Sequence, residues 1–385
     1  MVVDDGFRVF VGDVKTGKVN ATLPVSDHKW GIRLNEAGPI DATVRVRSQE
    51  ARALDLQNLT LTTKQFLGVS YGDTILECGP IWKRGFDPKT YELKLQAQGL
   101  WTIFDRRKNL PGASLRAPGD PLRVDPVQAQ YTVAGKHLGS IAREIVRRSI
   151  QDNPYGGQLP ISLPADIAGV HERTYYGYNL GWIGDDLREL TAVLGGPDLR
   201  FRPQFKAGNP DMVEWVLEHG KTNILSQTGP DWAWDASVER SQVADYGVDQ
   251  DGTGLAAFAW SPGTGQEESM RLAVARNLRL VNAGYPWTEV ENGSSQEESM
   301  VVLQSLANRT VADHSLPWDS WKMVVKANHN PTLGSYLPGD WAQARVPADH
   351  PVLPPNSVAR VRILSIDGGP SNNVSMAVAP IQGSV

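Results

Sequence analysis

The chain has 385 residues, of which 41% are hydrophobic and 21% are charged, so its composition is that of a folded globular protein and excludes a disordered one. This length allows roughly two to four domains. The formal net charge is -5, and no basic stripe runs through the sequence, which disfavours a nucleic-acid-binding protein.

Cysteine usage and hydropathy narrow the class further. Cys78 is the single cysteine, which excludes an intramolecular disulfide and a cysteine-rich metal site. We expect it to be a small buried side chain beside a strand. No apolar run reaches the ~18 residues of a membrane helix, and the N-terminus lacks a basic segment followed by an apolar one. The sequence therefore predicts a soluble chain that is made without a signal peptide and does not insert into a membrane.

The first part of the chain, residues 1–125, is predicted to be a β domain. Apolar and polar residues alternate over Ala42–Arg47, over Leu59–Thr62 and over Tyr91–Ala97. Phe7–Val11 is followed by Lys15–Lys18, whose Gly17 suits a hairpin turn. Alternation with a period of two predicts an antiparallel sheet with one solvated face.

A Pro/Gly-rich connection within residues 110–121 indicates a domain boundary. After it, apolar residues recur at helical spacing from Leu138 to Val146 and again from Ile183 to Leu194. Asp185 and Asp186 suit the first turn of the second helix. Residues 126–205 are therefore predicted to form a small inserted α/β domain.

The last part, residues 206–385, returns to strands, with clear examples at Met212–Leu217 and Arg271–Ala275. Trp232 and Trp234 also alternate as on a strand. A helical segment is predicted over 296–310, opened by a capping box of Ser295 and Glu298. The predicted fold class is α+β and rich in β structure, with two antiparallel β domains flanking the insertion.

One sequence pattern occurs in both β domains. A Tyr precedes a Gly-Asp turn at Tyr71–Asp73, and the outgoing strand returns by Ala97; the second copy runs from Tyr336 through Gly339–Asp340 to Ile366. We expect residues 71–97 and 336–366 to occupy equivalent places in two superposable β domains. A subunit that presents one kind of surface twice points to assembly more than to catalysis.

Searches for catalytic and metal-binding patterns give no candidate residues. The seven histidines lack zinc spacing, and no nucleophile elbow or phosphate-binding loop occurs. Asp249–Gly254 resembles the start of a calcium loop, but it lacks a third acidic ligand and the Glu that closes such a loop at its twelfth position. Adjacent carboxylates point in different directions and do not form an acid/base pair. We expect no enzyme activity, no cofactor and no metal site.

The order of elements resembles the tail-hub proteins of long-tailed, siphovirus-like bacteriophages, also called minor tail, baseplate-hub or tail-associated (Tal-type) proteins, with actinobacteriophage members most similar. The residues that carry this resemblance are Asp13, Thr16–Gly17, Trp30, Leu34–Asn35, Gly79–Trp82, Asp87, Tyr91–Leu95, Gly99–Trp101, Asp185–Leu190, Gly196–Phe201, Leu333–Tyr336, Pro338–Asp340 and Arg360–Ile366. The resemblance implies two β-barrel domains similar to the tail-tube subunit, with an α/β domain inserted after the first.

The resemblance also implies a function. It predicts a homotrimer whose six barrels form a pseudo-sixfold ring that caps the tail tube at the virion tip, after assembly in the host cytoplasm. Its partners would be the distal tail protein, the tape-measure protein and tip or fibre proteins, and it would open for DNA passage. Two alternatives stay open. One is a hexameric distal tail adaptor, and the other is a protein that binds or degrades cell-wall polysaccharide through Trp232, Trp234 and Trp318.

Overall fold

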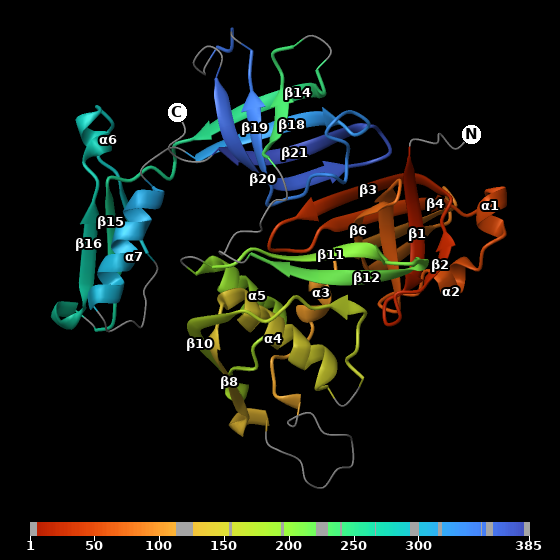
Figure 1. Ribbon diagram of the computed structural model, residues 1–385, viewed down its shortest axis with the longest axis horizontal. Coiled ribbons are helices and arrows are strands. Elements are labelled where there is room, and N and C mark those ends of the chain that lie inside the picture. Colours follow the sequence, from red (N-terminus) through yellow and green to blue (C-terminus); the bar gives the residue numbers. More distant parts are fainter. Residues whose placement is uncertain are drawn as a thin grey trace. The chain divides into compact units, whose positions relative to one another are not determined.

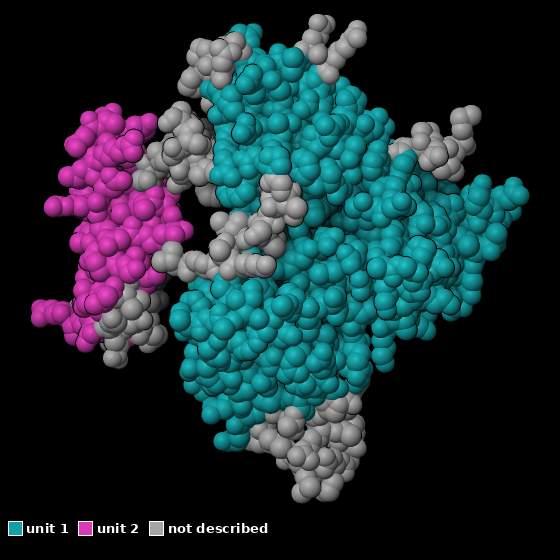
Figure 2. Space-filling model, viewed as in Figure 1, with its two compact units in different colours: residues 1–245, 323–378 teal, residues 246–322, 379–385 magenta. Residues whose placement is uncertain are grey.

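The structure, a computed structural model, describes residues 6–112, 126–153, 156–193, 196–220, 230–238, 241–265, 267–292, 300–314, 318–347, 349–351 and 357–380. The chain divides into two compact units: unit 1 is Met1–Asp245 with Met323–Val378, and unit 2 is Tyr246–Lys322 with Ala379–Val385 (Figure 2). Strands account for 46% and helices for 19%, so the fold is mostly β, as predicted. None of the described helices is long and apolar enough to cross a membrane.

The N-terminal part of unit 1, coloured red to orange in Figure 1, is an antiparallel sheet. Its strand order is β3-β4-β7-β6-β5-β1-β2. Its strands are β1 (Phe7–Asp13), β2 (Val19–Thr22), β3 (Val25–Arg33), β4 (Pro39–Arg45), β5 (Gln65–Tyr71), β6 (Thr74–Asp87) and β7 (Glu92–Gln98); its short helices are α1 (Gln49–Arg52), α2 (Leu56–Leu59) and α3 (Trp101–Phe104). The predicted hairpin joins β1 to β2, with Gly17 at a φ of 78°. Cys78 is buried within β6, as predicted.

The strand predicted over Leu59–Thr62 is wrong. Residues 56–59 form helix α2, because the Asp55 side chain accepts the backbone N–H of Asn58 and caps the turn. The Thr60 hydroxyl then donates to the carbonyl of Leu56 at 2.6 Å. Local capping therefore overrides the short alternation of Leu and Thr.

The middle of the chain combines two helices with short strands. It contains the 3-10 turns η2 (Pro126–Gln128) and η3 (Gly177–Asn179), the strands β8 (Gln130–Lys136), β9 (Ile161–Ser162), β10 (Ala168–Tyr176), β11 (Leu199–Lys206) and β12 (Asn209–His219), and the helices α4 (Leu138–Gln151) and α5 (Ile183–Ala192). Both predicted helices are confirmed. Antiparallel pairs join β8 to β10 and β11 to β12.

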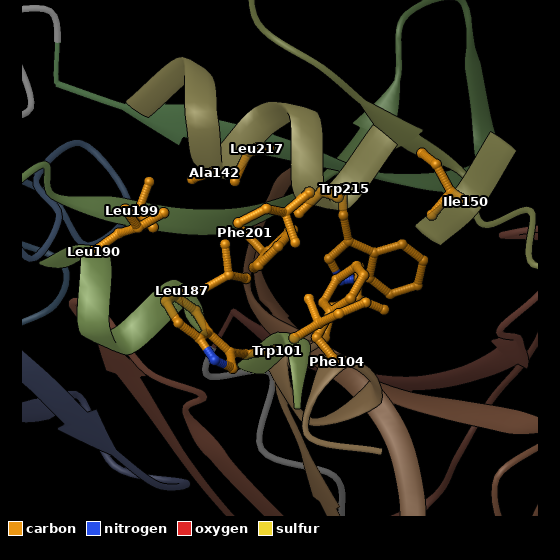
Figure 3. Close-up of a cluster of buried hydrophobic side chains, with 14 of the residues drawn as sticks. Trp101, Phe104, Ala142, Ile150, Leu187, Leu190, Leu199, Phe201, Trp215 and Leu217 are labelled. Atoms are coloured by element: carbon orange, nitrogen blue, oxygen red, sulfur yellow. The ribbon is translucent and has the colours of Figure 1, made fainter. Parts of the chain in front are cut away.

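These helices and strands share one hydrophobic core with the N-terminal sheet (Figure 3). Phe104 of α3 stacks on Phe201 of β11 with ring centroids 5.1 Å apart, and Trp101 meets the same ring edge-on. Trp215 of β12 contacts Phe66 of β5 edge-on and donates its indole N–H to the carbonyl of Cys78 at 2.9 Å. Large aromatic side chains thus fix the insertion against the first sheet.

The C-terminal strands of the chain are β13 (Trp232–Asp235), β14 (Val243–Asp251), β18 (Trp318–Lys326), β19 (Trp341–Arg345), β20 (Val358–Gly368) and β21 (Asn373–Pro380). The chain leaves unit 1 within β14 and returns within β18. In unit 1, β20 pairs with β19 and also, antiparallel, with β3. Strands from the two ends of the chain therefore lie in one continuous sheet.

The described strands form open sheets, and no closed barrel is found among them. In the N-terminal sheet, β2 and β3 are the two outermost strands. A closed barrel would need β3 to pair with β2, but β3 pairs with β20 instead. The division into residues 1–125, 126–205 and 206–385 stays a prediction about structural modules.

Unit 2 is a small α/β unit. It contains β15 (Phe258–Pro262), the 3-10 turn η4 (Glu267–Ser269), β16 (Leu272–Arg276), α6 (Arg279–Asn282), β17 (Glu289–Glu291) and α7 (Met300–Asp313). The strands form one sheet in the order β16-β15-β17, and α7 packs against it through Leu303 and Ala307. Helix α7 confirms the predicted helical segment, while Ser295 and Glu298 of the predicted capping box lie outside the described residues.

Candidate functional site: a charged junction

Two arginines of β11 and one glutamate of β12 form the centre of a charged network in unit 1. Arg200 and Arg202 lie two residues apart, on the same face of β11. Glu218 accepts from Arg200 Nη2 and from Arg202 Nε, each at 2.6 Å. Burial would raise the pKa of Glu218, but the two guanidinium groups outweigh it and hold this pKa below its ordinary value.

The same network contacts the turn of the second Tyr/Gly-Asp pattern. Arg200 Nη1 donates to the carbonyl of Pro338 at 2.9 Å. From β20, Arg362 donates to the carbonyl of Gly339 at 3.3 Å and forms an ion pair with Asp198, which precedes β11. The insertion is therefore tied to the C-terminal strands by charge-assisted hydrogen bonds, which are stronger than neutral ones. We call Asp198, Arg200, Arg202, Glu218, Arg362 and the backbone of 338–339 the charged junction.

Asp340 stabilises this turn from within. Its Oδ2 accepts the backbone N–H of Leu337 at 3.0 Å and the indole N–H of Trp232 at 3.1 Å. Burial raises the pKa of Asp340 against these hydrogen bonds. Gly339 adopts a φ of 100°, a conformation that a side chain would strain. The turn is therefore stabilised by its own aspartate in addition to its contacts with the arginines.

A third contact joins the junction to the N-terminal sheet. Asn35, at a φ of 63°, accepts the N–H of Leu199 through its side chain at 2.8 Å and donates its own N–H to the carbonyl of Leu199 at 3.2 Å. On the neighbouring strands, Arg33 of β3 pairs with Asp367 of β20 at 2.6 Å. The N-terminal sheet, the insertion and the C-terminal strands therefore meet at one place.

A buried carboxyl group lies next to the charged junction. Glu77 of β6 accepts the backbone N–H of Cys78 at 3.0 Å, and Gly38 approaches so closely that a Cβ there would lie 2.3 Å from Glu77 Oε2. Burial raises the pKa of Glu77 to about 8, although the backbone N–H groups and the charge of Arg33 lower it. A cavity of about 20 Å³, lined also by Arg200, lies beside it and has room for about one water molecule.

The geometry of the charged junction suits a joint more than a reaction centre. Both of its carboxylates are paired with arginines: Glu218 with Arg200 and Arg202, and Asp198 with Arg362. Across the described part of the chain, no group of three His, Cys, Asp or Glu side chains could hold a metal ion. In the calcium-like loop, Asp251 accepts from the backbone and the hydroxyl of Thr253 at 2.8 and 2.6 Å, which is a local turn.

The two sequence patterns do not mirror each other at their starts. Tyr71 ends β5, which pairs directly with β6, whereas Tyr336 precedes β19 in a loop. The two segments instead come close to each other. A Cβ at Gly334 would lie 2.9 Å from Thr74, and the pKa of Tyr336 is raised by burial and, to a smaller extent, by Tyr71. Both outgoing strands do pair antiparallel with their return strands, β6 with β7 and β19 with β20. Equivalence of the two β domains stays a prediction.

Sequence reasoning assigned no residue to a site and missed the charged junction. A signal was present, because Arg200 and Arg202 flank the buried Phe201 and therefore need carboxylates on one face. The three tryptophans named for sugar binding differ in their surroundings. Trp234 is buried, and Trp232 is half-buried and donates a hydrogen bond to Asp340. The side chain of Trp318 lies outside the described residues. The buried ring of Trp234 is therefore not accessible for the sugar stacking that this alternative would need.

Neither a family model nor a curated protein sequence matches the chain. Solved structures match over nearly its whole length. The tail protein from Neisseria meningitidis MC58 has a TM-score of 0.58 at 13% identity, with 98% of each chain covered. The 43 kDa tail protein of prophage MuSo2 from Shewanella oneidensis has a TM-score of 0.56 at 11% identity, with 97% of each covered.

Two further solved structures also match the chain. The prophage tail protein gp18 from Listeria monocytogenes EGD-e has a TM-score of 0.51 at 10% identity and covers 98% of this chain and 95% of its own. A chain of the Francisella PdpA-VgrG complex has a TM-score of 0.53 at 8% identity, with 98% of this chain and 58% of that chain covered. The fold is therefore shared with phage tail proteins, as the sequence resemblance predicted.

Proposed function

We propose that the chain is a structural subunit of a phage tail that lies at the distal tip as a baseplate-type hub and has no enzyme activity. The observation that carries this proposal is the likeness to the Neisseria and Shewanella tail proteins over 97–98% of both chains. A likeness of that extent includes both β regions and the insertion between them, which are the parts that such a hub needs.

In this proposal three chains form a ring, and each contributes two tube-like β modules to give pseudo-sixfold symmetry. The ring binds the distal tail protein above, the tape-measure protein within and tip or fibre proteins below, and it opens for DNA. The charged junction supports this role, because Arg200 and Arg362 tie the middle of the chain to the C-terminal strands. The ion pair of Arg33 with Asp367 joins the N-terminal sheet to the same strands. The long-tailed actinobacteriophage type is part of the same proposal.

Native mass spectrometry of the purified chain tests the assembly. We expect a species of three times 42.1 kDa. A species of six copies would instead favour the hexameric distal adaptor. Dilution and added salt serve as controls, since a specific ring keeps its stoichiometry while non-specific clusters change theirs.

Electron microscopy of the tails that carry the chain tests its place. We expect density for this fold at the tip, with threefold symmetry inside a sixfold tube. A chain that stays monomeric at all concentrations and is absent from purified tails would overturn the proposal. Zymograms on cell-wall material provide a second readout, and clearing by the isolated chain would contradict a purely structural role.

A further inference from the structure

A second candidate site lies in the middle of the chain, between β10 and α5. A cavity of about 210 Å³ is lined there by Tyr175 and Tyr176 of β10, Asn179 of η3, and Asp186 and Glu189 of α5. Asp186 and Glu189 are three residues apart, so they lie on the same face of α5. This cavity, which we call the acidic pocket, shares no lining residue with the charged junction.

The two carboxylates of the acidic pocket, Asp186 and Glu189, have no ion-pair partner among the described residues. Within the described residues, the carboxylate of Asp186 accepts one hydrogen bond, from the side-chain amide of Asn109 at 2.7 Å. Burial, followed by the charges of Glu189 and Asp185, raises its pKa to about 6 in spite of that hydrogen bond.

The neighbouring cations are engaged elsewhere. Arg188 pairs with Asp105 and Asp185, at 2.7 and 2.9 Å. Lys108 lies 3.2 Å from the ring centroid of Trp182 and donates to a backbone carbonyl. Arg173 lines the pocket, and its guanidinium donates to the carbonyl of Glu172 at 2.9 Å. Two carboxylates therefore face one guanidinium, which leaves the pocket acidic.

Exposed aromatic side chains form the rim of the pocket. Tyr176 stacks on Tyr178 with ring centroids 5.1 Å apart, and Tyr178 is 59% exposed. Leu180 and Trp182, which flank the pocket-lining Gly181 in the sequence, are also exposed. Tyrosine and tryptophan around a small pocket are typical of the energetic centre of a protein interface.

We propose that the acidic pocket binds an arginine or lysine side chain of a partner protein, whose apolar neighbours pack on the aromatic rim. The charge of the pocket selects a cation, and the tyrosine rings favour it further through cation–π attraction. Asp186 and Glu189 would accept hydrogen bonds from the guanidinium or ammonium group, and the stacked Tyr176 and Tyr178 would bury the adjoining residues. The pocket is large enough to admit a side chain but not a folded element.

The test uses the full chain and small probes, so its outcome does not depend on whether the chain joins a tail. Nα-acetylarginine amide is titrated by calorimetry or NMR, next to the neutral Nα-acetylnorleucine amide and to glucosamine. We expect the arginine probe to bind and the norleucine probe to bind at least tenfold more weakly. In the double variant Asp186→Asn/Glu189→Gln, the arginine probe should lose at least tenfold in affinity.

Asp185→Asn is the matched control, because Asp185 lies on the same helix, is exposed and pairs with Arg188 outside the pocket. It should change the affinity less than twofold. Equal loss in Asp185→Asn, equal binding of the neutral probe, or no binding of the arginine probe would each overturn the proposal. Preferential binding of glucosamine would also overturn it and identify a sugar site. The single variant Glu189→Gln, at an exposed position, keeps the test valid if Asp186→Asn perturbs folding.

Discussion

The cores of the two units are packed from different side chains. The core of unit 1 contains large rings such as Trp101, Trp215 and Phe201. The core of unit 2 is mostly alanine, with Leu303 and Val311 as its larger members. Strand β16 of unit 2 also leaves Leu272 and Val274 about two-fifths exposed. Because stabilisation scales with the apolar area removed from water, unit 2 should be the less stable unit.

Replacing a central ring of unit 1 gives the largest expected effect. Trp215→Ala removes a fully buried indole, its edge-on contact with Phe66 and its hydrogen bond to Cys78. We expect a loss of about 3–5 kcal/mol in unfolding free energy, measured by denaturant titration. Val170→Ala, at a position 91% exposed, should change it by less than about 0.5 kcal/mol. A loss under about 1 kcal/mol for Trp215→Ala would contradict the account of this core.

The next effect is a pH dependence that belongs to unit 1. The carboxyl of Glu77 ionises near its ordinary pKa of 4.5 when unfolded but keeps its proton to a pKa of about 8 when folded. Between these values the folded state holds more protons, so the unfolding free energy falls as pH rises.

We therefore expect a loss of roughly 2–3 kcal/mol from pH 6 to pH 8, at about 1.4 kcal/mol per unit, and a flatter profile in Glu77→Gln. Glu36→Gln, which is exposed beside the same cavity, is the control and should keep the wild-type slope. An unchanged slope in Glu77→Gln would show that another group carries the dependence.

A substitution with a smaller effect should show whether the two units unfold independently. Leu303→Ala removes the largest fully buried side chain of the unit 2 core, and we expect a cost of about 2 kcal/mol, at the low end for such a substitution. Hydrogen exchange should quicken in α7 and not in α4. Leu306→Ala, 41% exposed on the same helix, is the matched control. Faster exchange in both helices would mean that the units unfold together.

The charged junction should give the smallest effect on stability. Glu218→Gln leaves Arg200 and Arg202 without their anion and should cost about 1–2 kcal/mol in the denaturation of unit 1. Asp231→Asn breaks the more exposed pair with Arg360 and should cost less than Glu218→Gln. If both variants lose the same amount, the junction is no stronger than a surface ion pair.

Local patterns predicted local structure well. Helices α4 and α5 follow from apolar residues at helical spacing, and β4 and β7 follow from strict alternation, because each is set within one segment. The pattern at Leu59–Thr62 misled because it is short and adjoins the capping Asp55.

Contacts between segments far apart in the sequence were harder to predict. The pairing of β3 with β20 and the bonds from Arg200 to the turn at Pro338 depend on segments far apart in sequence, and no periodicity encodes a partner. Glu77 could have been noticed, since it interrupts the apolar run of β6. The acidic pocket could not, because Asp186 fits the first turn of a helix whether or not a cavity lies beside it.

The pairing of β3 with β20 also bears on how the chain is made. Ribosomes release β3 long before β20, and contacts between such distant segments form slowly. In that interval β3 is an edge strand whose outer N–H and C=O groups are unpaired, and an unpaired edge can recruit a strand from another chain. Nascent or truncated chains that stop short of Val358–Gly368 should therefore be the aggregation-prone form, and a chaperone that shields Val25–Arg33 would raise the yield of the folded protein.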